Sequence, residues 1–349
     1  MNPLESQLSY PLGDTIPAPG ALHEIVPGLR WARMPLPFAL DHVNLWLLDD
    51  THDGRAGASL VDTGAGTDAT RAAWETLFGS GLAGPLVRVF ATHCHPDHVG
   101  LSGWLCARFD APLWTTAGEF GFMRMMAAAL PGVDGPSALP HFMRHGLRDP
   151  ALLEQMRGRR NYYPSLVPAV PEAYTRLQDG QQVAIGAHRW RVITGFGHSP
   201  EHASFYCAEL NVLISGDMVL PRISTNVSVF AVEPEGNPLQ LYLDSLAKFA
   251  DLPDDVLVLP SHGKPFRGLH TRIAQLHEHH AARLQEVLDA CVTPRSAADI
   301  VPLMFRRPLD AHQLGFALGE ALAHLHKLWY DGQLQRHTEN NNVVLFERY

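Results

Sequence analysis

The chain has 349 residues, 46% of them hydrophobic, and a formal net charge of −9. This length suffices for one large core or for two domains, because single cores tend to split above about 250–300 residues. The negative charge argues against broad binding to nucleic-acid backbones, which relies on clustered Lys and Arg. It does not exclude a nuclease whose metal ion does the chemistry.

The cysteines and the first residues bear on the cellular compartment. Cys94, Cys106, Cys207 and Cys291 are widely scattered, without a CxxC pair. This spacing predicts reduced thiols in a cytoplasmic protein. Residues 1–21 are polar and rich in proline and glycine; we expect a loose arm there, and its pattern is not that of a signal peptide. No apolar run reaches the roughly 18 residues that a membrane-spanning helix needs.

The first third of the chain alternates apolar runs and helical patterns. Strands are predicted within residues 22–33, 42–49, 58–62, 86–91 and 112–116, and helices at residues 67–78 and 101–109. Strands that alternate with helices are typical of an α/β fold. Gly64 and Gly66 follow the third of these strands; a GxG pair alone is weak support for a phosphate loop, and a structural turn is the favoured interpretation.

The most informative stretch follows the apolar run 86–91. His93, His95, Asp97 and His98 lie within six residues there. Imidazole and carboxylate groups are ligands suited to zinc, iron or manganese, and a strand end holds the backbone so that they converge. A solvent-exposed polar loop is the alternative for a single HxH pair, but three histidines and an aspartate together favour a metal site. Cys94 lies between two of them and should point away from the metal.

Residues 117–176 interrupt this alternation. They contain helical segments rich in methionine and phenylalanine, separated by proline and glycine. Two interpretations remain open. The segment forms an adaptable lid over an apolar substrate, or its apolar side chains pack the inserted helices onto the body of the protein.

Further candidate ligands follow later strands. Residues 182–194 form a predicted strand before His198, and the predicted hairpin of residues 203–208 and 212–215 leads to Asp217. A helix capped by Asn237 comes next, and the strand 256–259 precedes His262. Because each of these residues follows an apolar strand, the strands can gather them at one sheet edge, in a number that suits two ions.

The C-terminal third is predicted to be mostly helical. Helices are expected at residues 273–291, 297–305 and 313–330, followed by strands at 333–336 and 343–347. The cluster His277, Glu278, His279 and His280 lies within the first helix, where a solvated helix face is favoured over a metal site. His324 and His326 are two residues apart and cannot share a helix face, so we expect no site there.

These motifs resemble those of the metallo-β-lactamase superfamily. THCHPDHVG at residues 92–100 matches its HxHxDH motif, GHSPEH at 197–202 its second histidine motif, SGD at 215–217 its bridging aspartate and SHG at 261–263 its last histidine. The resemblance covers residues 22–265 and implies an αββα sandwich with a dinuclear site at one edge. Asp62, in VDTG, matches the family's first motif, in which the carboxylate supports the site.

The resemblance also implies which residues hold each metal. The first ion would be held by His93, His95 and His198, the second by Asp97, His98 and His262, with Asp217 bridging the two ions. The bridging residue is Asp and not Cys, which fits the hydrolase branches better than the antibiotic-degrading zinc enzymes. Two divalent ions are therefore expected, with zinc favoured over iron or manganese.

The predicted domains are residues 1–21, an arm; residues 22–268, an α/β catalytic domain with the helical insertion 117–176; and residues 269–349. The last part resembles the winged-helix domain of a subgroup that includes endoribonucleases and thioesterase-like enzymes. Its helix 313–330 carries Glu320 and, as a base, only Lys327, which disfavours DNA binding. The oligomeric state, a homodimer included, is left open by the sequence.

The predicted activity is that of a metal-dependent hydrolase that directs an activated hydroxide at an ester or thioester carbonyl, acyl-CoA-like thioesters included. This places the protein near the glyoxalase-II-like and thioesterase-like branch, with a small-molecule substrate and no membrane partner. Asp97 would orient the hydroxide or accept its proton. The alternative is a phosphodiesterase or endoribonuclease acting on single-stranded RNA, against which the acidic charge counts. A non-enzymatic regulatory role is disfavoured by the intact ligand set.

Overall fold

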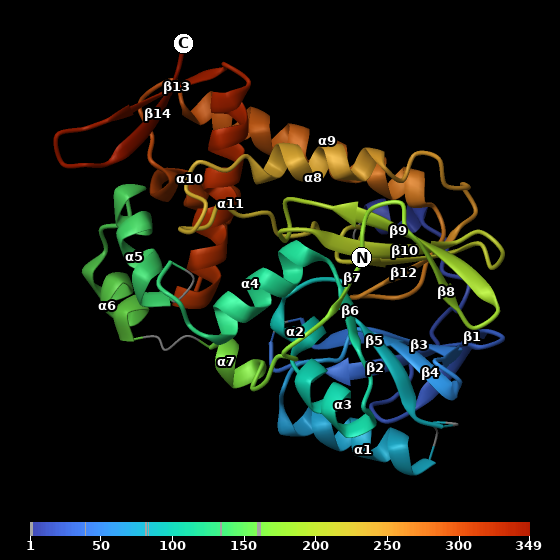
Figure 1. The fold of residues 1–349 in the computed structure, drawn as a ribbon. Coiled ribbons are helices and arrows are strands. Elements are labelled where there is room, and N and C mark those ends of the chain that lie inside the picture. Colours follow the sequence, from blue (N-terminus) through green and yellow to red (C-terminus); the bar gives the residue numbers. More distant parts are fainter. Residues whose placement is uncertain (1–2, 39, 81, 83, 133–134, 159–161) are drawn as a thin grey trace.

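The computed structural model describes residues 3–38, 40–80, 82, 84–132, 135–158 and 162–349. Two sheets pack face to face and helices cover their outer faces (Figure 1), which confirms the predicted αββα sandwich. A third, two-stranded sheet lies near the C-terminus. Among the described helices, none combines the length and apolarity needed to cross a membrane.

The first sheet, as the described residues form it, has seven strands in sequential order. They are β1 (Leu22–Val26), β2 (Leu29–Pro35), β3 (His42–His52), β4 (Arg55–Val61), β5 (Leu86–Phe90), β6 (Leu113–Thr115) and β7 (Thr175–Arg176). The pairs from β1 to β4 are antiparallel and those from β4 to β7 are parallel. The single strand region predicted at residues 22–33 is two strands, because Gly28 adopts a φ of 80° and turns the chain between them.

The second sheet has five strands in the order β12-β11-β10-β9-β8. They are β8 (Gln182–Ile185), β9 (His188–Gly195), β10 (His202–Cys207), β11 (Val212–Gly216) and β12 (Leu257–Pro260). The predicted hairpin is the antiparallel pair of β10 and β11, whereas β11 and β12 are parallel. The predicted strand 182–194 is divided at Gly186, which has a φ of 58°.

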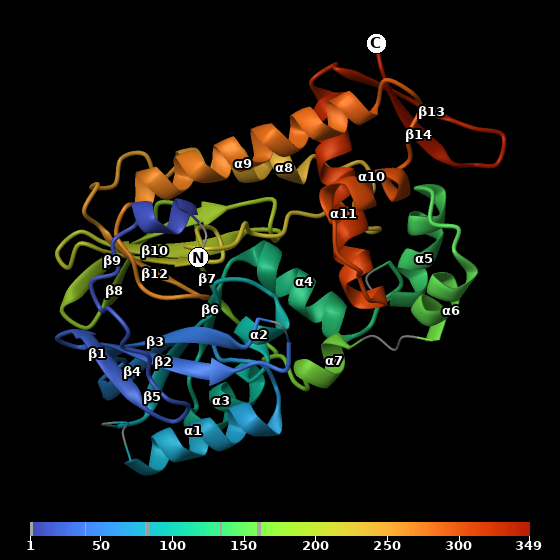
Figure 2. The same cartoon turned by 180° about the vertical axis from the view of Figure 1, so that it is seen from behind.

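Three apolar layers hold the sandwich together. Large side chains of both sheets, among them Trp31, Trp46 and Phe205, fill the space between the sheets. The outer face of the first sheet packs on α1 (Asp68–Ser80) and α3 (Ser102–Phe109). The outer face of the second sheet packs on α8 (Pro238–Ala247) and α9 (Leu269–Ala290), which run along it in Figures 1 and 2. Asn237 caps α8 as predicted, by accepting a hydrogen bond from the backbone of Gln240.

Within its described residues, the segment 117–176 contains four helices before β7 joins the first sheet. They are α4 (Ala117–Ala127), α5 (Gly135–Arg144), α6 (Pro150–Gly158) and α7 (Tyr163–Leu166). Met123 of α4 is fully buried in the apolar cluster of the first sheet. Leu153 and Met156 of α6 join the cluster that contains the C-terminal helices. These side chains favour the interpretation in which the apolar residues pack the inserted helices onto the body.

The C-terminal part consists of α9, α10 (Ala297–Met304), α11 (Ala311–Tyr330) and the antiparallel strands β13 (Leu334–Thr338) and β14 (Val344–Arg348). These elements confirm the predicted order of helices and strands. One expectation is wrong: the cluster at residues 277–280 is not entirely a solvated face, because His280 is buried against His324 of α11. The helix is covered on that side by α11, which helical spacing alone does not reveal.

The N-terminal residues, expected to form a loose arm, contact the sandwich. Leu8 is buried, and the backbone of Ser9 pairs with that of Arg267. The side chain of Gln275 on α9 donates to the carbonyl oxygen of Leu4 and to the side chain of Gln7. The composition of the segment is polar, but these hydrogen bonds attach it to α9.

Candidate metal centre

The donors of the candidate centre gather at one edge of the two sheets. The loop after β5 carries His93 and His95 and continues into the short helix α2 (Pro96–Val99), which begins with proline and carries Asp97 and His98. Pro96 suits the first helical position, because its missing N–H has no partner there in any helix. This turn presents Asp97 and His98 on the same side as the histidines that precede it. The donor atoms of these residues fall into groups whose members lie close enough together to hold a metal ion.

His93, His95 and His198 form the first group. The Nε2 atom of His93 lies 2.9 Å from Nδ1 of His95 and 3.2 Å from Nε2 of His198. Two of these residues come from the loop after β5, and the third follows β9 of the other sheet. Three imidazole nitrogens that converge in this way suit one divalent ion.

Asp97, His98 and His262 form the second group. An Oδ2 atom of Asp97 lies 3.4 Å from Nε2 of His98 and 3.4 Å from Nε2 of His262. His262 follows β12, so this group also draws on both sheets. The two groups share no residue.

Asp217, directly after β11, lies between the two groups. Its Oδ2 atom is 3.5 Å from Nε2 of His198 in the first group, and its Oδ1 atom is 3.5 Å from Nε2 of His262 in the second. Each oxygen therefore faces a different group. Among the described residues, Nε2 of His98 and Oδ1 of Asp217 are buried without a hydrogen-bond partner. Buried polar atoms without partners are costly unless something binds them, so the donor set fits divalent metal ions.

The electrostatics differ between the groups. Burial, reinforced by the nearby His198, lowers the pKa of His95 to about 3. Burial also acts to lower the pKa of His262, but the carboxylates of Asp217 and Asp97 outweigh it and raise that pKa to about 10. The pKa of Asp217 is held well below its usual range because His262 and His98 outweigh burial. Metal binding at the second group therefore requires His262 to release a proton.

Asp62 and Thr92 contact the Nδ1 atoms of His98 and His93, on the side of each ring that faces away from the centre. Oδ2 of Asp62 accepts a hydrogen bond from Nδ1 of His98 at 2.8 Å, and Asp62 also accepts from the backbone N–H and the hydroxyl of Thr92. The Thr92 hydroxyl oxygen lies 3.0 Å from Nδ1 of His93. With each Nδ1 atom occupied, the Nε2 atom of each ring is left to face the centre.

Backbone carbonyls orient the two other histidines. His198 donates from Nδ1 to the carbonyl oxygen of Asn226 at 2.7 Å. His262 donates from Nδ1 to the carbonyl oxygen of His42 at 2.7 Å, and the His42 ring accepts from the backbone of Gly263. A carbonyl can only accept, so both imidazoles carry a proton on Nδ1, and Nε2 is the ring nitrogen that faces the centre.

Two buried residues at the centre were not anticipated. Glu119 of α4 accepts from the backbone of Cys94 at 2.7 Å, and its other oxygen accepts from the Ser199 hydroxyl and the Glu201 backbone at 2.6 Å each. It therefore ties the loop that carries His93 to the loop that carries His198. Burial raises its pKa above the usual value. A glutamate at helical spacing in an apolar segment gives no local signal of this role.

His202 is the second such residue. Its Nε2 atom accepts from the backbone of Asp217 at 3.1 Å, and its ring stacks on that of His93. A side chain at Gly216 would place its Cβ 2.2 Å from the same Nε2 atom, so glycine is required there. The histidine lies inside GHSPEH, so the motif itself contained a signal for it.

The remaining expectations near the site concern Cys94 and the two glycines. Cys94 is buried in the apolar cluster of the first sheet and belongs to none of the candidate groups of the described residues, as expected. A Cβ at Gly66 would lie 2.5 Å from the carbonyl oxygen of Leu166, and one at Gly64 would lie 2.7 Å from Thr70. The glycines thus permit close packing, which favours the structural turn over a phosphate loop.

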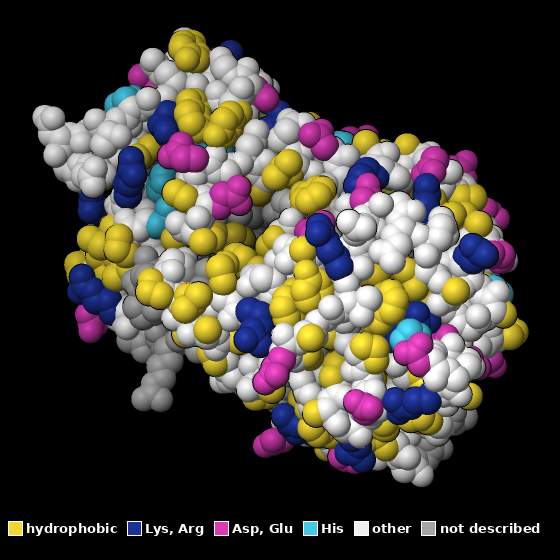
Figure 3. All heavy atoms as spheres, in the orientation of Figure 1, with side chains coloured by type: hydrophobic (Ala, Val, Ile, Leu, Met, Phe, Trp, Pro, Cys, Tyr) yellow, Lys and Arg dark blue, Asp and Glu magenta, His cyan; other side chains and the backbone are white. Residues whose placement is uncertain are grey.

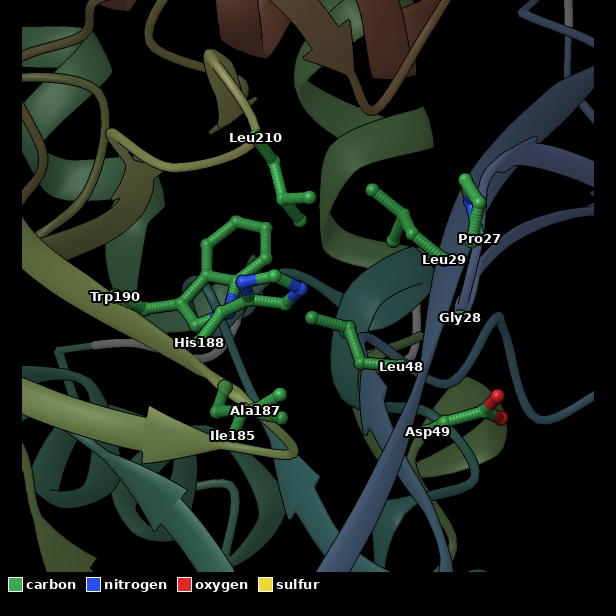
Figure 4. Close-up of a pocket in the computed structure, with 10 residues that line it drawn as sticks. All are labelled: Pro27, Gly28, Leu29, Leu48, Asp49, Ile185, Ala187, His188, Trp190 and Leu210. Carbon is green, nitrogen blue, oxygen red and sulfur yellow. The ribbon is translucent and has the colours of Figure 1, made fainter.

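A cavity lies at the opposite end of the sandwich from these donors. It is lined by Pro27, Gly28, Leu29, Leu48, Asp49, Ile185, Ala187, His188, Trp190 and Leu210 (Figure 4). Leu29 and His188 begin β2 and β9, whereas the candidate ligand His198 follows the end of β9. This cavity is therefore separate from the candidate centre.

A sandwich of two sheets with clustered histidines and aspartates at one edge defines a class of metal-dependent hydrolases. Residues 39–262 match the model of the metallo-beta-lactamase superfamily, and residues 284–349 match the model described as metallo-beta-lactamase-like, C-terminal domain. The first match covers more than half of the chain. The chain belongs to the metallo-beta-lactamase superfamily, and it is a metallo-hydrolase of that superfamily.

Known proteins resemble the chain over different lengths. The solved structure of a beta-lactamase domain protein from Burkholderia ambifaria is 56% identical, covers all of both chains and superposes with a TM-score of 0.94. The probable metallo-hydrolase YqjP of Bacillus subtilis (strain 168) is 24% identical over 328 residues, which is 89% of this chain and 95% of that protein. Ribonuclease BN of Enterobacter sp. (strain 638) is 29% identical over 153 residues, 44% of this chain and 42% of that protein.

Proposed function

We propose that the protein is a dinuclear hydrolase in which His93, His95 and His198 hold one ion and Asp97, His98 and His262 hold the other. Asp217 would bridge them. The observation that carries this proposal is the position of Asp217, whose two oxygens face different groups at 3.5 Å each. Two divalent ions held there, for which we favour zinc over iron or manganese, would supply a hydroxide near neutral pH and would polarise the scissile carbonyl.

The protein's own residues prepare that chemistry. Asp97 is the least buried of the three donors in its group, so it is the carboxylate placed to orient an attacking water or to accept its proton. Asp62 is buried behind His98 and acts by holding that ring. His198 and His262 are fixed in one tautomer by backbone carbonyls, so no rotation is needed before they bind an ion.

The preferred substrate is an ester or thioester of a small molecule, acyl-CoA-like thioesters included. Support comes from the segment between Asp217 and α8, which carries Asn226 behind His198. Ile223 and Phe230 on this segment are 46% and 41% exposed, so the segment that follows Asp217 offers apolar side chains to an acyl group. This proposal places the protein near the glyoxalase-II-like and thioesterase-like branch.

The proposed organisation is a catalytic domain over residues 22–268, with the insertion 117–176 bordering the site, and a winged-helix-like domain over residues 269–349. The elements α10, α11, β13 and β14 follow one another in the order that such a domain requires. The cysteines of the described chain are all free and buried, which supports a cytoplasmic location.

The alternative is a phosphodiesterase acting on single-stranded RNA, supported by the partial similarity to ribonuclease BN. Binding to a phosphate backbone requires a groove of positive charge. On the face shown in Figure 3, Lys and Arg side chains are interspersed with Asp and Glu, without a continuous basic stripe. The net charge of −9 also favours the ester or thioester.

The experiment combines metal analysis with a substrate panel. The wild-type protein and the variants His198→Ala and Asp217→Ala are analysed for bound metal and assayed on thioesters, lactones, aryl esters, β-lactams and short RNA. We expect both variants to lose metal and activity together while the fold is retained. Full activity in a metal-depleted variant would contradict the mechanism. Hydrolysis of RNA alone would make RNA, and not an ester or thioester, the favoured substrate.

A further inference from the structure

The orientation of one candidate metal ligand depends on a residue of the C-terminal helix α11. His198 donates from Nδ1 to the backbone carbonyl oxygen of Asn226. The side-chain amide of Asn226 in turn donates to Oε2 of Glu320 at 3.1 Å. Glu320 lies within α11, far along the chain from every candidate ligand. These contacts connect the C-terminal part to the first metal group through a single residue.

The amide of Asn226 is held at both ends. Its oxygen accepts from the hydroxyl of Ser228 at 2.8 Å, while its nitrogen donates to Glu320. An asparagine amide with both ends bonded cannot rotate without breaking one of the bonds, so the Asn226 side chain is held in place and restrains the backbone segment that carries its carbonyl. The Nδ1 proton of His198 follows that carbonyl, and its Nε2 lone pair is thereby directed at the first group.

The surrounding contacts keep this segment on α11. The backbone of Val229 donates to the carbonyl oxygen of Gly319 at 3.1 Å. A Cβ at Gly319 would lie 2.7 Å from that of Ser228, so the close approach requires glycine. One turn later, His324 donates from Nδ1 to the carbonyl oxygen of Glu320, and its ring meets His280 of α9. The turn that carries Glu320 is therefore fixed from both sides.

We propose that Glu320 is a positioning residue for the first metal, so that the C-terminal helix forms part of the catalytic unit. The inference rests on the proposed function, because it requires His198 to be a metal ligand. It gives α11 a role that differs from nucleic-acid recognition: its acidic residue acts on the metal centre through Asn226, without contact with substrate.

The test uses the full-length protein loaded with cobalt, in which the absorption of the ion reports its coordination. Glu320→Ala removes the acceptor, Glu320→Gln keeps an acceptor oxygen at the same reach, and Glu286→Ala is the matched control on the exposed face of α9. We expect Glu320→Ala to weaken binding of one of the two ions by about 10–100-fold in chelator competition, as loss of such supporting contacts does. Its cobalt spectrum should change, and kcat should fall with little change in KM.

Glu320→Gln should restore affinity and spectrum to within about threefold, and Glu286→Ala should match the wild type. If Glu320→Ala does not fold, Glu320→Asp, which shortens the side chain by one methylene, replaces it and should give a smaller change in the same direction. Wild-type affinity and spectrum in the folded Ala or Asp variant would overturn the proposal. So would equal losses in the Ala and Gln variants.

His198→Ala separates this inference from the proposed function. If that variant still binds two cobalt ions as the wild type does, the ligand assignment fails and the role of Glu320 fails with it. If His198→Ala loses one ion while the Glu320 variants keep both, only the positioning role is wrong. Metal affinity and spectrum require no knowledge of the substrate, so the result is independent of the ester or thioester proposal.

Discussion

Glu119 joins the two loops that carry the first metal group, and its replacement should separate them. The carboxylate accepts three hydrogen bonds, from the backbone of Cys94, the hydroxyl of Ser199 and the backbone of Glu201. Glutamine has one acceptor oxygen and one donor nitrogen. In Glu119→Gln the amide nitrogen must therefore face at least one of these donors, in a region where the side chain is fully buried.

The cost follows from that conflict. A buried N–H left without an acceptor destabilises a protein by about 1–3 kcal/mol. We expect Glu119→Gln to lower the free energy of unfolding by about that amount, and Glu119→Ala, which leaves all three donors without an acceptor, by about 3 kcal/mol or more. Because His93 and His198 lie on the loops that Glu119 joins, metal affinity should fall about tenfold in the Gln variant.

Guanidinium unfolding curves measure the first effect, and chelator competition on the metal-loaded protein measures the second. Glu75→Gln is the matched control, since Glu75 lies on α1 and pairs with Arg108 at the surface. It should change the free energy of unfolding by less than about 0.5 kcal/mol. Wild-type stability and metal affinity in Glu119→Gln would refute the assignment of Glu119 as the link between the loops.

Three other predictions concern the centre and its surroundings. Asp62→Asn places an amide where Nδ1 of His98 needs an acceptor, and metal titration should show about tenfold weaker metal binding than in the wild type. Unchanged metal affinity would contradict the supporting role of Asp62. Removal of metal by a chelator should lower the melting temperature, since ligand at 1,000 times its Kd stabilises by about 4 kcal/mol; calorimetry with and without zinc tests this. Burial, with the nearby His141, lowers the pKa of His145 to about 3. Below about pH 6.5 the unfolded chain therefore binds a proton at this residue that the folded chain does not bind. The free energy of unfolding should therefore fall by about 2 kcal/mol, on account of this residue, as the pH is lowered from 7.5 to 5. In His145→Gln the fall should be smaller by that amount; a pH dependence identical to that of the wild type would disprove this role of His145.

The sequence pattern was sufficient to predict an α/β fold and the strand ends at which the donors gather, and the resemblance to the metallo-β-lactamase superfamily implied the αββα class. Those features are local: an apolar run predicts a buried strand, and a histidine or aspartate directly after it has its place determined by the strand. Glu119 could not be predicted in this way. Its partners, Cys94 and Ser199, follow strands of different sheets, and nothing in the segment around Glu119 indicates which loops α4 will touch.

The histidines of α11 show why the C-terminal part was harder to interpret. His324 and His326 do not share a helix face, which correctly excludes a joint site but leaves open what each does. In the structure both are buried, His324 against His280 of α9 and His326 by donating to the carbonyl oxygen of Gly236, in the segment before α8. A helix with different partners on two sides has no single apolar face to detect.

The same burial bears on how the two parts of the chain depend on each other. Leu322 and Leu325 of α11 belong to the apolar cluster that also contains Val258 of the second sheet and Tyr242 of α8. Removal of α11 would therefore expose apolar surface of the catalytic sandwich, besides removing the acceptor for Asn226. Because the candidate ligands of the second sheet follow strands that this cluster supports, the geometry of the candidate centre and the packing of the C-terminal helices are properties of one folded unit. This chain matches the superfamily model and the C-terminal domain model one after the other, which is the arrangement expected of such dependence.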